Sequence, residues 1–101
     1  MATFGIVDRF PGGTREQYEN SIAVVYPDGG KALPEGQLLH LAGPSRDGWL
    51  VMTVHESRES WERFRDETLM PGLAGVDDGL RGPPEETTFD VEVFHTRHRT
   101  A

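Results

Sequence analysis

The chain has 101 residues, the length of a single domain, so we expect one domain over residues 1–101. It contains no cysteine, which excludes disulfides, thiolate nucleophiles and zinc–sulfur sites. Its net charge of −7 argues against nucleic acid, whose phosphates repel an acidic protein. No stretch approaches the ~20 apolar residues of a membrane span, and no charged signal-peptide region precedes the first strand pattern. We therefore expect a cytoplasmic protein that contacts no membrane.

The first expected elements are a strand and a helix. Residues 3–9 alternate in the manner of a strand, and the Pro-Gly-Gly at 11–13 breaks it. Thr14 is a good helix cap, and Gln17 completes a capping-box pattern. The helix that follows ends near Tyr26, and its apolar stripe is Tyr18, Ile22 and Val25.

A hairpin and a second helix form the middle of the chain. After a loop over residues 28–36, we expect strands at 37–42 and 49–56, joined by a turn-rich segment at 43–48. Ser57 can cap a helix over 57–70. The spacing of its apolar face, Trp61, Phe64 and Thr68, is helical, and Pro71 is expected to end it.

The last part of the chain is less regular. Residues 72–86 hold four glycines and two adjacent prolines, which predicts an irregular segment. Residues 88–95 alternate as a final strand. The polar tail at 96–101 is expected to fray.

The element order is therefore β-α-β-β-α-β, which predicts an α+β, ferredoxin-like fold: a four-stranded antiparallel sheet with two helices on one face. The two middle strands do not alternate, because both of their faces are apolar. Strands of a sheet with one solvent-exposed face should alternate apolar and polar residues. We therefore expect the helix-free face to meet a second copy of the chain in a homodimer.

At this point the sequence resembles the dimeric α+β barrel superfamily, which includes the antibiotic-biosynthesis monooxygenase-like proteins, and most closely its small actinobacterial members. The similar element order spans almost the whole chain, and the motif itself covers roughly a third of it. The motif residues are His40, Gly43-Pro44, Gly48-Trp49, Val51, Val54, Glu56-Ser57, Glu59, Trp61, Phe64 and Leu69-Met70-Pro71.

The resemblance implies that two units pair sheet to sheet and that each keeps a pocket between its sheet and helices. It implies a small cofactor-independent enzyme, of monooxygenase, cyclase or isomerase type, that acts on a hydrophobic or aromatic metabolite. The superfamily also contains haem-degrading enzymes and proteins without known chemistry, so the fold alone does not give a function. The alternative is a non-enzymatic ligand-binding or assembly dimer.

His40 is the candidate catalytic residue. It stands between leucines in a strand that we expect to be central or nearly so. An imidazole there can act as general acid or base, because its ordinary pKa lies near neutrality. The competing interpretation is a core histidine whose ring nitrogens are satisfied by hydrogen bonds.

The expected substrate-binding residues are four aromatic side chains and a second histidine. Aromatic residues at helical or strand spacing are usually core, but some can line a planar pocket. The histidine could lie at the mouth of that pocket, although a solvated position at the strand end is the interpretation we favour. These residues are Tyr18, Trp49, Trp61, Phe64 and His55.

Other polar residues have weaker claims. Asp8 and Arg9 could assist a base or bind a carboxylate, or could form an ion pair at the end of a strand. His95 and His98 could bind a metal only if their segment were helical, so we expect no metal site. We expect no cofactor. A haem is the alternative that stays open: it would need an axial histidine, and nothing distinguishes His40 from His55 for that role.

Overall fold

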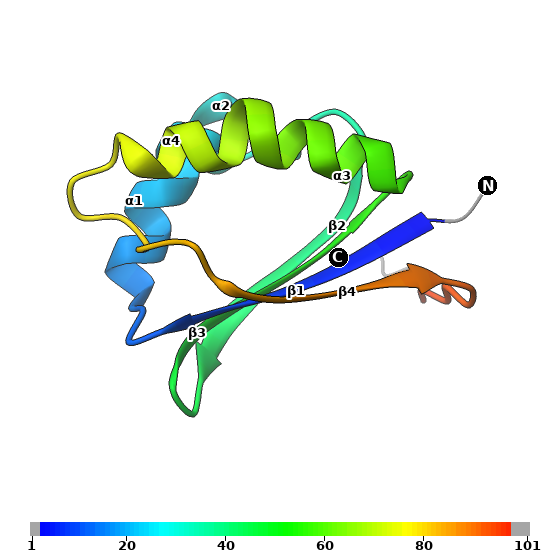
Figure 1. The fold of residues 1–101 in the computed structure, drawn as a ribbon, viewed down its shortest axis with the longest axis horizontal. Coiled ribbons are helices and arrows are strands. Elements are labelled where there is room, and N and C mark those ends of the chain that lie inside the picture. Colours follow the sequence, from blue (N-terminus) through cyan, green and yellow to red (C-terminus); the bar gives the residue numbers. More distant parts are fainter. Residues whose placement is uncertain (1–2, 98–101) are drawn as a thin grey trace.

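Four antiparallel strands form one open sheet in the computed structural model, which describes residues 3–97 (Figure 1). The strands are β1 (Thr3–Pro11), β2 (Gln37–Ser45), β3 (Gly48–His55) and β4 (Glu85–Val91). Their order across the sheet is β2-β3-β1-β4, and all neighbouring strands are antiparallel. The predicted α+β class with a four-stranded antiparallel sheet is confirmed.

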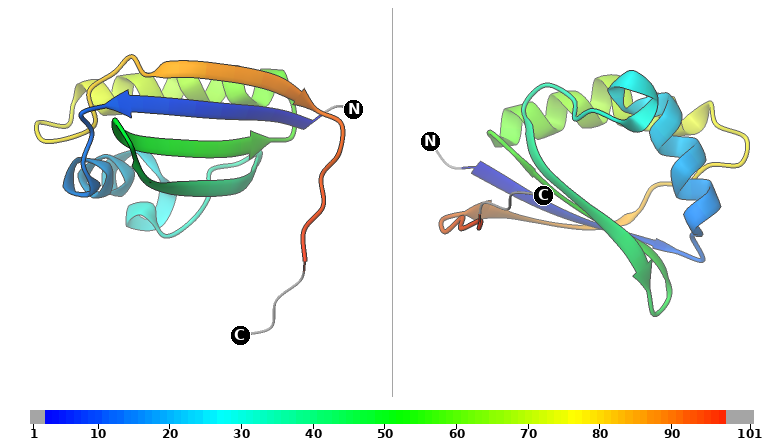
Figure 2. Two further views of the ribbon diagram at one scale, coloured as in Figure 1. Left: turned by 90° about the horizontal axis from the view of Figure 1, so that it is seen from below. Right: turned by 180° about the vertical axis from the view of Figure 1, so that it is seen from behind.

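The helices cover one face of this sheet, and the opposite face is left open (Figures 1 and 2). They are α1 (Arg15–Val25), the single turn α2 (Pro27–Gly30), α3 (Arg58–Phe64), the π-helical turn η1 (Arg65–Leu69) and α4 (Met70–Ala74). Together α3, η1 and α4 form one long rod across the sheet (Figure 1). Within residues 3–97, no helix has the length and apolar character that crossing a membrane requires.

Both predicted helix starts are confirmed by their hydrogen bonds. The Gln17 amide N–H donates to the Thr14 hydroxyl, and the Thr14 amide N–H donates to the Gln17 side chain, each at 3.1 Å. This is the reciprocal arrangement of a capping box. The Ser60 amide N–H donates to Ser57 Oγ, also at 3.1 Å, which fixes the start of α3.

The second helix does not end at Pro71, because a π-helical turn precedes it. The Met70 amide N–H donates to the carbonyl of Arg65, five residues back. This wider turn loosens the helix just where the proline ring would otherwise clash with the preceding turn. The wider turn also adds one residue to the helical repeat. Leu69 therefore packs against the core, whereas Thr68, which the sequence pattern predicts on the apolar face, is exposed.

Three further expectations are corrected. The hairpin turn is only Arg46 and Asp47, because both strands extend further toward it than the turn-forming residues suggested. The last strand is Glu85–Val91, so residues 92–95 lie outside it. The strand that carries His40, β2, is an edge strand rather than a central one. The predicted fraying of the tail concerns residues that include 98–101, which lie outside the described part of the chain.

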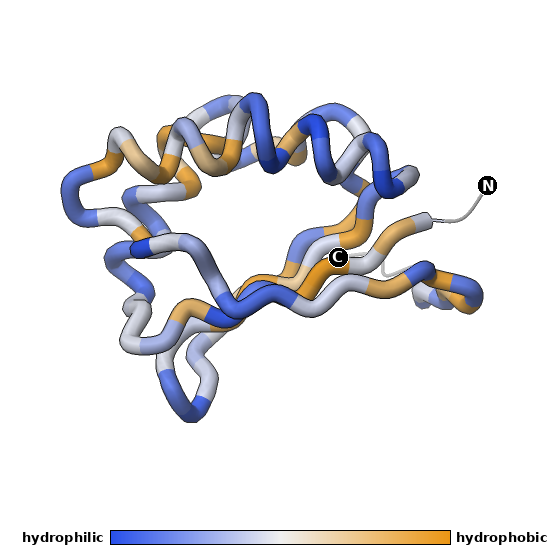
Figure 3. Tube along the Cα trace, in the orientation of Figure 1, coloured by the Kyte–Doolittle hydropathy of each residue, from blue (hydrophilic) through white to orange (hydrophobic). Residues whose placement is uncertain are grey.

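The core lies between the helices and the sheet. Phe4, Ile6 and Phe10 from β1 are buried there with Trp61 and Phe64 from α3. Hydrophobic residues follow the middle of the strands, whereas the first turns of α3 are mostly hydrophilic (Figure 3). Alternation along β1 therefore directs every second side chain toward the helices.

The helix-free face of the sheet (Figure 2, left) carries mainly apolar side chains on β1, β2 and β3. Two rows of side chains run across it in strand order: Leu39, Val54, Gly5 and Phe89, and then Leu41, Met52, Val7 and Thr87. Leu41 is 53% exposed and Phe89 is 49% exposed. An exposed apolar surface of this kind marks an interaction site more often than a solvated one.

Gly48 provides a test of how the hairpin packs on β1. It has a φ of +155°, and an added Cβ would lie 2.6 and 2.8 Å from the backbone nitrogens of Gly12 and Gly13. We expect Gly48→Ala to lower the free energy of unfolding by about 1–3 kcal/mol, because rigid backbone atoms must move. Urea denaturation measures this change. Gly43→Ala is the control, since open space surrounds Gly43. An equally small effect of both variants would contradict the prediction.

Candidate functional site

An interior cavity between the sheet and the helices collects most of the predicted site residues. His40, Tyr18, Trp61 and Phe64 all line it. Its volume is about 30 Å³, which leaves room for only about one or two water-sized molecules. The rest of its wall is largely apolar and comes from β1, β3, α1, η1, α4 and the segment before β4.

The other two predicted residues, Trp49 and His55, do not line this cavity and lie one layer behind it. Trp49 is buried against Tyr18, with ring centres 5.1 Å apart. His55 packs against Trp61 and Phe64, with ring centres 5.5 and 5.6 Å away. Both residues therefore support cavity-lining rings from behind.

His40 has partners for both ring nitrogens. Its Nε2 lies 2.6 Å from the Tyr18 hydroxyl. Its Nδ1 lies 3.0 Å from the Tyr26 hydroxyl and 3.2 Å from Gln37 Oε1. Burial lowers the pKa of His40, so the ring is neutral at pH 7. Burial also raises the pKa of Tyr18 and of Tyr26, so both phenols keep their protons.

The Gln37 side chain fixes the tautomers of both histidines. Its Oε1 can only accept a hydrogen bond, so His40 Nδ1 carries the hydrogen, and His40 Nε2 is left to accept from Tyr18. Its Nε2 can only donate, so His55 Nε2, 3.1 Å away, accepts. His55 Nδ1–H then donates to Ser60 Oγ at 3.0 Å. The result is a continuous hydrogen-bonded chain from Tyr18 to Ser60.

A β-bulge makes this chain possible. Residues three apart in a regular strand point to opposite faces. The register of β2 against β3 shifts between Gln37 and Leu39, which places Leu38 in the bulge. Gln37 and His40 consequently share the helix-facing side of the sheet, opposite His55 and Thr53 respectively.

His55 is not a solvated strand-end residue, so that interpretation is wrong. Its side chain is 0% exposed. Desolvation by burial lowers its pKa to about 4. The ring is therefore neutral near pH 7, with both nitrogens used by Gln37 and Ser60.

Asp8 and Arg9 do not form the ion pair that their adjacency suggested, because successive strand residues face opposite sides. Asp8 is buried on the helix side and lines the cavity, whereas Arg9 is exposed on the other face. Burial, together with the hydrogen bond that the protonated Asp8 donates to Glu86 and the charge of Glu86, raises the pKa of Asp8 to about 8. Asp8 is thus mainly a neutral carboxylic acid at pH 7.

Two polar atoms of cavity-lining residues have no hydrogen-bond partner among residues 3–97. They are Asp8 Oδ1 and the indole Nε1 of Trp61. Buried polar atoms are normally satisfied, so each is a candidate contact for a bound molecule. A hydroxyl group can both donate to an oxygen and accept from an N–H, and it suits such a cavity.

Sequence reasoning missed Tyr26, Gln37 and Ser60. Tyr26 stands eight residues after Tyr18 at the end of α1, a spacing that only roughly preserves the helix face. Ser60 lies in the first turn of α3, three residues after the Ser57 cap, and its sequence context indicates only a helix start. Nothing in the sequence indicates that Gln37 contacts His40, because regular alternation places these two side chains on opposite faces of the sheet.

Residues 3–97 form no three-residue metal site. Over the described residues, no group of three or more His, Cys, Asp or Glu side chains is placed to hold a metal ion. His95 lies within those residues, and His98 lies outside them. The pair considered from the sequence therefore has no described geometry.

The burial of His55 makes the stability of the protein depend on pH. Unfolding raises the pKa of His55 from about 4 to its ordinary value near 6.5, so the unfolded chain binds more protons between these values. The stability that comes from keeping His55 neutral is fully present above pH 6.5 and is lost as the pH falls toward 4. We expect the wild type to lose about 2–3 kcal/mol more stability than His55→Gln between pH 7 and pH 4.5.

Urea denaturation at four pH values measures this difference. Comparing the variant with the wild type cancels the opposite contribution of Asp8, whose raised pKa favours the folded state at low pH. His95→Gln, which removes an exposed histidine, should follow the wild type. Parallel curves for the wild type and His55→Gln would contradict the prediction.

Comparison with known proteins adds no assignment to this geometry. No family model, no curated protein and no solved structure matches the chain. The function must therefore be argued from the cavity and its hydrogen-bonded residues.

Proposed function

We propose that this protein is a small cofactor-independent enzyme, of the monooxygenase, cyclase or isomerase type, that moves a proton on a hydrophobic or aromatic metabolite. The observation that carries the proposal is the 2.6 Å hydrogen bond between the Tyr18 hydroxyl and His40 Nε2 at the wall of an apolar cavity. A neutral imidazole in this position is a suitable general base.

The proton transfer needs only residues of this chain. A substrate hydroxyl or acidic C–H takes the place of Tyr18 as the partner of His40 Nε2, which accepts its proton. The Nδ1–H bond to Gln37 keeps the ring oriented during this step. Tyr18, whose phenol stays protonated, then donates a hydrogen bond to the oxygen on which negative charge develops.

A ring-sized substrate needs more room than the cavity provides in this state. The half-buried hydrophobic wall residues on the helical segments, Tyr18, Ile22 and Leu69, can make room, because the fully buried ones are held in the close-packed core. The aromatic rings of Trp61 and Phe64 then offer flat apolar contacts to the substrate.

We also propose that the protein is ferredoxin-like and pairs sheet to sheet as a homodimeric α+β barrel. The strand order β2-β3-β1-β4 and the placement of the helices on one face support the first part. The apolar rows through Leu41 and Phe89 support the second, because a partner sheet would remove them from water. Glu85 and Arg9 limit this surface at one end.

A non-enzymatic ligand-binding or assembly dimer is the second candidate. Both ring nitrogens of His40 are already satisfied by protein groups, as in a structural histidine. The small volume of the cavity favours the same interpretation. Turnover is the measurement that separates the two candidates.

The catalytic test screens phenols, anthrones and unsaturated lactones for oxygen uptake or rearranged products. For a substrate that turns over, we expect His40→Gln to lower kcat/KM by about 10²–10⁴-fold, because the base is lost. Tyr18→Phe should lower kcat with a smaller effect on KM, since its hydroxyl acts on developing charge. His95→Gln is the control. Binding without turnover across the panel, or unchanged turnover in His40→Gln, would reject the catalytic role.

The test of assembly is the molar mass in solution. We expect twice the 11.3 kDa of the chain by light scattering. Leu41→Asp should give monomers, because it places a charge on the apolar face that would be buried against the partner sheet. Val24→Asp is the matched control, since Val24 is 63% exposed on α1, away from this face. A monomeric wild type would show that the sheets do not pair.

A further inference from the structure

A second hollow opens beside β4 and meets the interior cavity at two residues. It has a volume of about 280 Å³, close to the size of small-molecule sites. Asp8 and Leu69 line both the hollow and the cavity. We call it the Asp8 hollow; its other lining residues are Arg65, Met70, Pro83, Pro84 and Glu86.

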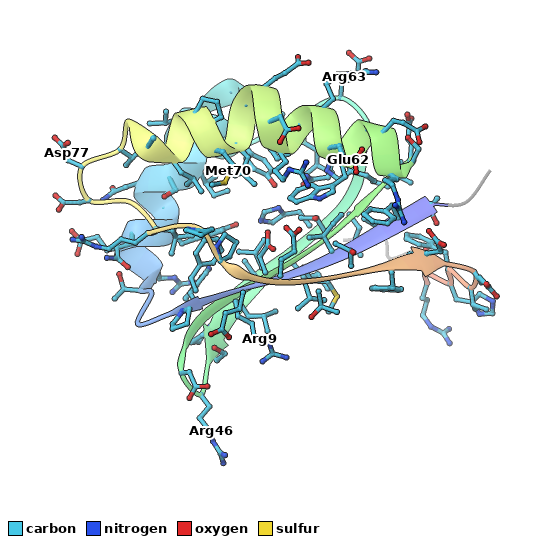
Figure 4. The ribbon with its side chains drawn as sticks, viewed as in Figure 1. Arg9, Arg46, Glu62, Arg63, Met70 and Asp77 are labelled. Atoms are coloured by element: carbon cyan, nitrogen blue, oxygen red, sulfur yellow. The ribbon has the colours of Figure 1, made fainter. Side chains whose placement is uncertain are left out.

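The walls of the Asp8 hollow are mainly apolar. Met70 lies on the side of the helical rod that faces the sheet (Figure 4), and an added Cβ at Gly82 would lie 3.7 Å from its methyl carbon. Pro83 and Pro84 close the side next to β4. Leu69 belongs to the π-helical turn, a kind of irregularity that is frequent at functional sites.

Asp8 provides the polar group in this setting. Its side chain is 5% exposed, and its cross-strand neighbour is Glu86. Burial raises the pKa of Asp8, so Asp8 keeps its proton at pH 7 and shares it with the exposed Glu86 through a hydrogen bond. The second oxygen, Asp8 Oδ1, is then a carbonyl acceptor with no partner in the described part of the chain.

We propose that the Asp8 hollow binds a small apolar molecule that carries a hydroxyl or N–H group and donates this hydrogen to Asp8 Oδ1. We further propose that the substrate passes Asp8 and Leu69 to reach His40; only this second step rests on the proposed function. Asp8 would thus select ligands by a hydrogen that they donate, while the prolines, Leu69 and Met70 contact the apolar body.

Charge at the site supports a neutral donor over a cation. The titratable or charged groups that face Asp8 are Glu86 from β4, Arg65 from η1, Tyr18 and Tyr26 from α1 and its C-cap, and His40 from β2. A protonated amine would have to expel the shared proton and approach the Arg65 guanidinium. A phenol or alcohol needs neither change.

The binding test compares phenol with anisole, which has the same ring but no hydrogen to donate. We expect the wild type to bind phenol about five- to tenfold more tightly than anisole, the effect of one hydrogen bond. In Asp8→Leu the two affinities should become equal. Asp90→Leu, at an exposed position further along β4, should keep the wild-type ratio. Equal binding of the two probes to the wild type would show that Asp8 does not select donors.

Stability provides a second measurement on Asp8. Folding must keep the buried Asp8 carboxyl protonated above its ordinary pKa, which lowers stability, so the uncharged Asp8→Asn should raise Tm. The pKa of Asp8 is higher in the folded protein, so the wild type loses stability as the pH rises from about 4 to 8. The gain in Tm should therefore be larger at pH 8 than at pH 5. A lower Tm for Asp8→Asn at both pH values would assign Asp8 a structural role and overturn the proposal.

The location is tested on the wild-type protein, which removes dependence on variant folding. We expect NMR cross-peaks between the ring protons of bound phenol and the Met70 methyl group. Cross-peaks confined to residues outside the Asp8 hollow would overturn the proposal.

His40→Gln separates this inference from the proposed function. It should retain phenol binding in the hollow even where it abolishes turnover. If phenol binds as expected and no substrate turns over, the result supports the binding site in the Asp8 hollow and rejects the proposed enzyme activity. If His40→Gln abolishes turnover while Asp8→Leu leaves the ratio of phenol to anisole affinity unchanged, the result supports the enzyme activity and rejects the binding site in the Asp8 hollow.

Discussion

The hydrogen bonds of the Gln37 side-chain amide are the constraint on which the candidate site depends. One end of the amide holds His40 and the other holds His55, so two imidazoles inside a largely apolar core are satisfied together. A buried polar group without a partner costs roughly 1–3 kcal/mol. Loss of this amide would therefore expose His55 Nε2 to that penalty. It would also leave His40 Nδ1 with the Tyr26 hydroxyl alone, which can donate or accept, so the tautomer of His40 would be undefined. The same contact stabilises the fold and prepares His40 Nε2 as an acceptor.

Two local irregularities, one in a strand and one in a helix, shape the site around this amide. The bulge at Leu38 turns Gln37 onto the face of His40. The π-helical turn moves the core position of the long rod from Thr68 to Leu69, and Leu69 then separates the interior cavity from the Asp8 hollow. Both irregularities add one residue to a regular repeat, and both change which side chains face the cavity.

Polar groups are concentrated at one layer of the core, and this concentration has a thermodynamic cost. Asp8 is held as a neutral acid beside Glu86, and His40 and His55 are held as neutral bases. An apolar layer of similar volume would be more stable, because none of these groups would need desolvation. Natural sequences retain such a burden mainly where a site requires it. The arrangement is thus consistent with a place that binds or transforms a ligand.

The sequence by itself determined the class of the fold and the helix starts at Thr14 and Ser57, and it singled out His40 as a candidate. These depend on local signals: hydroxyl side chains at caps, alternation in strands and an imidazole among leucines. Only the tertiary structure decided that β2 lies at an edge, that Gln37 joins His40 to His55, and that Asp8 is separated from Arg9 and faces the cavity. The physical reason is that strand order, a one-residue bulge and a π-helical turn are fixed by packing between distant segments. A shift of one residue in either element reverses which side chain is buried, and no local pattern records it.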